Sequence, residues 1–263
     1  MSPSVGDSAS DEQVVHLAIG KMRENNNAFP MTVKAFFDDA DRYLNRGDIL
    51  LSRSPFLASR LIRWSSRSFF SHAAIVFLLP QDKEYFSNTF VIESLFKGVG
   101  IANLETYVSG RNPVEVGILR LEGQGFNQDF FKRSNGVLLN EVNRPYDFHR
   151  LWRMALVALF GFQLAIRRMQ RRPNVYRRWF PRQFICSGFI QYGFYQAALF
   201  SNIATRCVIL KNGLVDPSPD EMMGITPEDL ATSDRLTWKY VIRRGWVYEA
   251  ENYAAAKRII SGA

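Results

Sequence analysis

The sequence is poor in cysteine and histidine, and no apolar run approaches the roughly 20 residues that cross a bilayer. Two cysteines, Cys186 and Cys207, in 263 residues are too few for a disulfide scaffold and are typical of a reducing compartment. Two cysteines and three histidines without short paired spacing argue against a zinc site. No Gly-rich loop precedes a helical pattern, so nucleotide chemistry has no support. We therefore expect neither a metal nor a cofactor.

The N-terminus also lacks the apolar segment of a secretory signal peptide. Residues 1–30 are rich in Ser, Asn and Asp, which predicts a mobile tail. We expect residues 31–263 to form one folded domain. From these features we expect a cytoplasmic location. Peripheral attachment to a membrane is considered with the charge distribution below.

The net charge of +8 is concentrated in one stretch. Residues 144–182 contain ten arginines and one acid, Asp147, giving a local charge of +9, whereas the rest of the chain has 23 basic and 24 acidic residues. The positive charge thus belongs to an insert at about residues 148–182. Any anionic partner should bind there.

This insert combines its arginines with an apolar segment, residues 154–162. An apolar helix with arginine ends is compatible with burial in the domain, with a lid over a hydrophobic site, or with insertion into a membrane interface. In the last case arginines would contact the phosphates of an anionic membrane. These are Arg153, Arg167, Arg168, Arg171 and Arg172. Nucleic acid is disfavoured, because the aromatic residues are mixed with an aliphatic run that base stacking does not require.

Periodicity predicts a series of strands followed by helices. Short segments rich in Val, Ile, Leu and Phe predict strands at 49–52, 72–79, 89–94, 98–103, 114–121, 207–210, 238–242 and 246–248. Helical spacing predicts helices at 33–44, 126–143, 148–172 and 185–200, with a proline-started turn at 226–230. The result is a mostly antiparallel sheet with helices around it.

Three residues of this pattern have the chemistry of a thiol hydrolase. His72 opens one strand, Glu93 lies in the next, and Cys186 begins a helix. A helix N-terminus favours the thiolate and offers free amides to an oxyanion. A carboxylate in the apolar run around Glu93 needs a partner. The alternatives are that Cys186 is a small core residue and that the relevant histidine is His16 or His149.

The ordered sequence blocks around this trio resemble a known family. They are Gly47-Asp48-Ile49-Leu50, Ser71-His72-Ala73-Ala74, Val91-Ile92-Glu93-Ser94, Tyr146-Asp147-Phe148, Ile185-Cys186-Ser187 and Thr226-Pro227-Glu228-Asp229-Leu230. The set resembles the circularly permuted papain-like cysteine hydrolases of the NlpC/P60 superfamily, in particular the YiiX/YebB-like group. The resemblance implies an α+β fold in which a central antiparallel sheet packs against the helix carrying the nucleophile. It also implies Cys186 as nucleophile, His72 as base and Glu93 as the residue that orients it.

The resemblance leaves the substrate open. It implies cleavage of an amide or ester through a thioester acyl-enzyme, by a hydrolase or an acyltransferase, with an acyl- or amide-containing substrate. The insert favours lipid or acylated substrates at a membrane surface. The alternatives are a peptidoglycan or peptide amidase of the same fold and a non-enzymatic membrane- or partner-binding module. Candidate substrate-binding residues are Tyr146, Asp147, Ser187 and Gly188. Members of the resembling family often have an acidic residue soon after the cysteine, where this sequence has Ser187-Gly188-Phe189.

Overall fold

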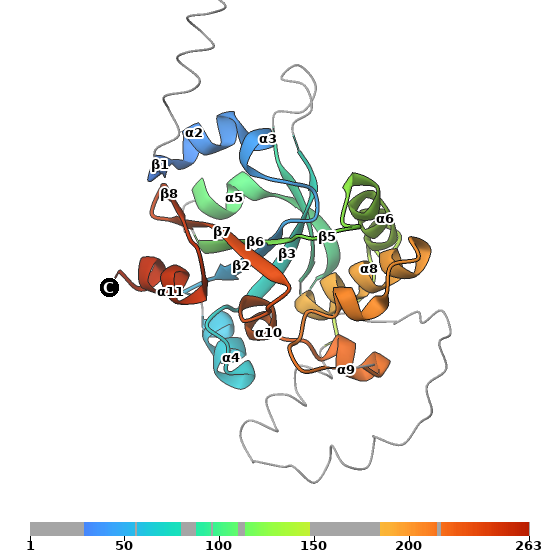
Figure 1. Cartoon of the computed structure of the whole chain (residues 1–263). Helices are drawn as coiled ribbons and strands as arrows, with labels where there is room; N and C mark the ends of the chain where they lie inside the picture. The colour runs from blue at the N-terminus through green and yellow to red at the C-terminus, as the bar shows by residue number, and fades with distance from the viewer. Residues whose placement is uncertain are drawn as a thin grey trace, which may run out of the picture.

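A computed structural model describes residues 29–55, 57–79, 88–95, 97–109, 114–147, 185–214 and 217–262. The described residues form one sheet of eight strands in the order β1-β8-β7-β6-β2-β3-β4-β5, and every neighbouring pair is antiparallel. Helices cover both faces of this sheet (Figure 1). The predicted α+β class with a central antiparallel sheet is confirmed. The predicted 148–172 helix and the insert around it lie outside the described residues.

The strands follow the short β-branched and aliphatic segments of the sequence. Their bounds are β1 Met31–Thr32, β2 Ile49–Arg53, β3 His72–Leu78, β4 Phe90–Leu95, β5 Gly98–Asn103, β6 Glu115–Leu121, β7 Leu236–Arg243 and β8 Trp246–Glu249. The central strands are buried on both sides, because side chains alternate between two hydrophobic clusters. The central strands therefore form a middle layer, whereas the outermost strand β5 exposes Ile101 to solvent.

One face of the sheet is covered by short helices from the first half of the chain. These are α2 Val33–Asp38, α3 Ala40–Tyr43 and α5 Leu104–Ser109. Phe36, Tyr43 and Leu104 from these helices pack with Leu50, Val76, Val91 and Ile118 of the strands. The single helix predicted for 33–44 is wrong, since the chain breaks at Asp39, whose φ and ψ of −123° and 39° are not helical.

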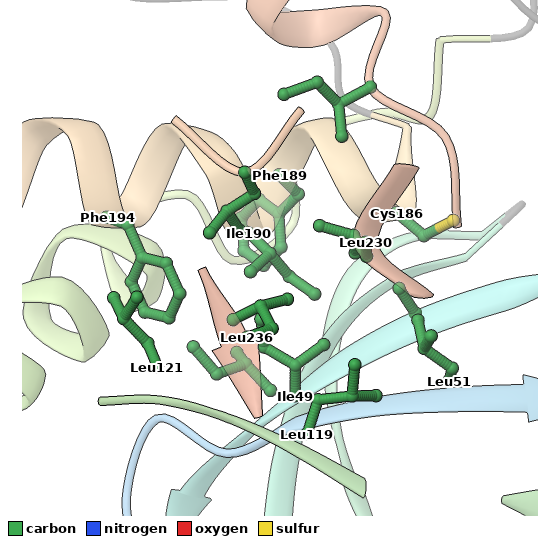
Figure 2. Packing of buried hydrophobic residues seen from close by; sticks show 14 of the residues in the cluster. Ile49, Leu51, Leu119, Leu121, Cys186, Phe189, Ile190, Phe194, Leu230 and Leu236 are labelled. Carbon is green, nitrogen blue, oxygen red and sulfur yellow. The ribbon is translucent and has the colours of Figure 1, made fainter. Parts of the chain in front are cut away.

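The other face is covered by α6 Gln128–Leu139 and by the long helix α8 Cys186–Phe200, which lie side by side (Figure 1). Figure 2 shows Phe189, Ile190 and Phe194 of α8 above the aliphatic side chains of β2 and β6. Gly193 permits the contact with α6, because a Cβ there would lie 2.7 Å from the side chain of Leu138. This packing fixes α8, and with it Cys186, against the sheet.

Smaller elements complete this side. They are α4 Leu57–Ser66, a 3-10 helix at Thr205–Val208, α9 Pro219–Met223, α10 Pro227–Ala231 and α11 Tyr253–Ser261. The predicted strand at 207–210 is wrong. The segment begins inside the 3-10 helix and continues as irregular chain, which the side-chain amide of Gln191 on α8 holds in place. That amide donates to the carbonyl of Val208 and accepts from the N–H of Leu210, each at 2.9 Å. A buried side chain thus satisfies backbone groups that a strand would have paired.

Candidate active site

Cys186 is the first residue of α8, and its side chain points out of the helix start (Figure 2). Ile185 precedes it in extended conformation and provides no side-chain cap to the helix. The amides of the first turn have no intrahelical acceptor and carry the positive end of the helix dipole. Cys186 therefore lies where a thiolate is stabilised, as expected from the sequence.

The two residues after the cysteine hold this helix start in place. Ser187 is fully buried and its hydroxyl donates to the backbone carbonyl of Ile225. Gly188 faces the backbone of Met223, so that a Cβ would lie 2.6 Å from its carbonyl oxygen. The two contacts are with the last residue of α9 and with the segment that joins α9 to α10. These contacts show why a small residue is needed at each of the two positions. The predicted role of Ser187 and Gly188 in substrate binding stays a prediction.

His72 reaches the cysteine from the start of β3. Its partner on β2 is Ser52, whereas the pairing of β3 with β4 starts two residues later, at Ala74 and Glu93. The backbone N–H of Ala73 lies before this β3–β4 pairing and hydrogen-bonds to the sulfur of Cys186. The end of the strand pairing thus makes room for the thiol between the sheet and α8.

Glu93 lies on β4 beside His72 and is 3% exposed. Its Oε2 lies 2.6 Å from Nε2 of His72, which leaves Nδ1 as the ring nitrogen available to Cys186. The same carboxylate oxygen accepts a hydrogen bond from the hydroxyl of Tyr107 on α5. The buried carboxylate predicted to need a partner therefore has two.

The hydrogen bonds shift the protonation equilibria of the site in favour of charged groups. Burial alone would raise the pKa of Cys186, but the hydrogen bond and charge of His72, together with the amides of Ala73 and Ser187, lower it. Burial alone would lower the pKa of His72, but Cys186 and Glu93 raise it from 6.5 to about 10. Burial raises the pKa of Glu93, yet His72 and Tyr107 hold it below its ordinary range. These directions favour a thiolate next to an imidazolium at neutral pH.

Two further predicted residues lie near this group. Tyr146 is buried, and burial followed by the charges of Cys186 and Asp147 raises the pKa of its hydroxyl. Asp147 follows it at the end of the described segment. Their role in substrate binding stays a prediction. The predicted contact residues Arg153, Arg167, Arg168, Arg171 and Arg172 lie outside the described residues.

Tyr107 is a side chain of the site that the sequence did not predict. It contributes no motif: it lies in a six-residue helix that Asn103 begins by accepting from the N–H of Glu105. The only related signal in the sequence was a carboxylate, Glu93, within an apolar run. Such a carboxylate requires a hydrogen-bond donor, but the sequence does not indicate which residue supplies it.

The described residues include neither a metal-binding cluster nor a membrane-spanning helix. No group of three or more His, Cys, Asp and Glu side chains is placed to hold a metal ion in this part of the chain. Across the same residues, no helix has both the length and the hydropathy of a membrane span.

Comparison with known proteins identifies the family. Residues 43–240 match the family described as permuted papain-like amidase enzyme, YaeF/YiiX, C92 family. A crystal structure of the metalloprotein YiiX from Escherichia coli O157:H7 is similar with a TM-score of 0.44 and 14% identity, covering 74% of this chain and 96% of that one. A search of curated proteins found no match. Because the family match extends over most of the sequence, the chain belongs to the permuted papain-like amidases, and the resemblance inferred from the sequence blocks is confirmed.

Proposed function

We propose that this permuted papain-like amidase cleaves an acyl bond, in the first instance an amide, with Cys186 as nucleophile and His72 as acid and base. The observation that supports the proposal most is the hydrogen-bonded series Cys186, His72, Glu93 at the start of α8. Glu93 would orient the imidazole and stabilise its charged form. Tyr107 would fix the carboxylate that does so.

The proposed reaction has two steps. The Cys186 thiolate attacks the carbonyl carbon, and the oxyanion that forms is met by backbone amides of the helix start. The His72 imidazolium then protonates the leaving nitrogen as the C–N bond breaks, which leaves a thioester on Cys186. In the second step neutral His72 takes a proton from water, the resulting hydroxide attacks the thioester, and the acid is released with return of the proton to the Cys186–His72 pair. An amine or alcohol in place of water would make the reaction an acyl transfer.

The proposal that the substrate carries an acyl chain rests on the sequence of the insert. Its apolar and arginine-rich residues end shortly before Cys186, so they are close in the chain to the nucleophile. An acylated lipid or peptide at an anionic membrane surface would suit both features. Peptidoglycan and peptide amides remain the alternative substrates within the same chemistry.

The test is turnover on matched substrates. The purified chain is incubated with N-acyl peptides, with mixed phospholipids and with peptidoglycan fragments, and the products are followed by mass spectrometry. We expect Cys186→Ala and His72→Ala to lower kcat/KM at least about 1,000-fold without unfolding, whereas Cys207→Ala retains activity. Full turnover by Cys186→Ala would contradict the proposal. A biological effect that survives Cys186→Ala but is lost in Arg167→Ala with Arg171→Ala would favour the binding module instead.

A further inference from the structure

A second site is suggested by a hollow of about 420 Å³ at one end of the sheet. It is bounded by the end of β2, by α4, by the start of β6 and by the turn that joins β7 to β8. Its lining residues are Arg53, Ser54, Pro55, Arg63, Val114, Glu115 and Arg244. Neither Cys186 nor His72 lines the hollow.

The lining has an excess of positive charge. Three arginines face one glutamate, which leaves two positive charges. The negative charge of Glu115 is moreover shared between two arginines. Its carboxylate lies 3.7 Å from Arg53 and 3.9 Å from Arg243, which does not line the hollow. Arg63 donates to the carbonyl of Ser54 at 2.7 Å, which orients it without neutralising it. Burial, followed by the charges of Arg53 and Arg60, lowers the pKa of Arg63. The arginines therefore repel one another, and an anion between them would relieve that repulsion.

Arg244 occupies a backbone position that does not suit arginine. It forms a two-residue hairpin turn with Gly245, and the two residues have φ of +48° and +83°. Such turns favour Asn-Gly or Gly-Gly, because most L-residues are strained at positive φ. A short polar residue would be more stable at this exposed position. Arginine instead brings a guanidinium into the lining of the hollow.

We propose that this hollow binds a phosphomonoester. Guanidinium groups bind phosphate through paired N–H donors, and a dianionic phosphomonoester matches the two excess charges of the lining. A phosphate fills a small part of the volume, which leaves room beside Pro55 and Val114 for the group that carries it. The phosphate belongs either to a soluble molecule or to a lipid headgroup such as that of phosphatidic acid.

The test measures binding directly and does not depend on catalysis. Glycerol 3-phosphate is titrated into the full chain by calorimetry at low ionic strength, and co-sedimentation compares phosphatidylcholine vesicles with and without phosphatidic acid. We expect saturable binding of one equivalent, weakened at least about 10-fold by Arg63→Gln and by Arg244→Asn. Arg206→Gln, which removes an exposed charge elsewhere, and Cys186→Ala should leave it unchanged.

Arg244→Asn separates loss of binding from loss of folding. Because Asn accepts positive φ, this variant should melt about 2 °C higher than the wild type while it binds the phosphate less well. Binding of glycerol 3-phosphate would assign the site to soluble phosphomonoesters. Binding of the acidic vesicles that depends on Arg63 and Arg244, without binding of glycerol 3-phosphate, would assign the site to the lipid headgroup. Absence of binding to both probes would overturn the proposal. Binding that survives in Arg244→Asn, or that Arg206→Gln weakens equally, would do the same.

Discussion

Gly188 gives the sharpest structural prediction, because its neighbours are backbone atoms that cannot rotate away. A Cβ at this position would lie 2.6 Å from the carbonyl oxygen of Met223 and 3.0 Å from its Cα, whereas ordinary contacts begin at 3.4 Å. Gly188→Ala therefore requires the helix start or the 223–225 segment to move by about 0.8 Å. Alanine gains about 1 kcal/mol of helix propensity, and overpacking costs about 1–3 kcal/mol. We expect a net loss of up to about 2 kcal/mol.

The displacement would be felt at the thiol, two residues earlier. A misplacement near 1 Å costs on the order of 100-fold in rate, so kcat/KM of Gly188→Ala should fall about 10- to 100-fold. Gly136→Ala is the matched control: it lies exposed in α6 with nothing within 4 Å of the added Cβ, and should stabilise the chain by about 0.5–1 kcal/mol with unchanged activity. For both variants, urea unfolding measures the change in stability and turnover measures the change in activity. Gly188→Ala as stable and as active as Gly136→Ala would refute this reasoning.

Three other substitutions test charged groups, two of them at the site and one in a buried ion pair of the sheet. Tyr107→Phe removes one donor to Glu93 and should lower kcat/KM about 10-fold with little loss of stability; an unchanged rate would show that the carboxylate needs no second donor. Glu93→Gln should lower the pKa of His72 from about 10, so the alkaline limb of the pH–rate profile should move to lower pH, because the imidazolium is then lost earlier. An unmoved limb would exclude Glu93 as its partner. Asp48→Ala leaves Arg120 without the carboxylate that lies 2.7 Å from its Nε; urea unfolding should show a loss of about 3 kcal/mol, and a loss below about 1 kcal/mol would mean that the pair is screened.

Much of the sheet could be predicted because its strands are short, aliphatic and bounded by turn residues. The start of α8 could also be predicted, since Pro181 precedes an apolar run that begins at Phe184. The 207–210 segment was misread because its apolar residues are buried by tertiary packing, and the hydrogen bonds that hold it come from the side chain of Gln191. No local pattern records such a long-range partner.

The site divides in the same way. Residue type, the family resemblance and the cost of a buried carboxylate predicted Cys186, His72 and Glu93 as a group, and the structure brings these three side chains together. Tyr107 and the amide of Ala73 were not predicted, because they depend on where α5 packs and on where the pairing of β3 with β4 begins. The role of Gly188 as a close contact also required the position of Met223, which is distant in sequence.

The pH dependence of cysteine alkylation tests the central claim most directly. Cys186 is only 6% exposed and Cys207 is more exposed, so accessibility alone favours labelling of Cys207. With a lowered thiol pKa and a raised His72 pKa, the thiolate of Cys186 persists at pH 6.5, where an ordinary thiol is about 1% ionised. Peptide mass spectrometry after iodoacetamide treatment at pH 6.5 should show Cys186 labelled at least about 10-fold faster than Cys207, and His72→Ala should abolish the difference. Equal labelling of the two cysteines in the wild type, with both rates rising only near pH 8.5, would contradict an activated Cys186.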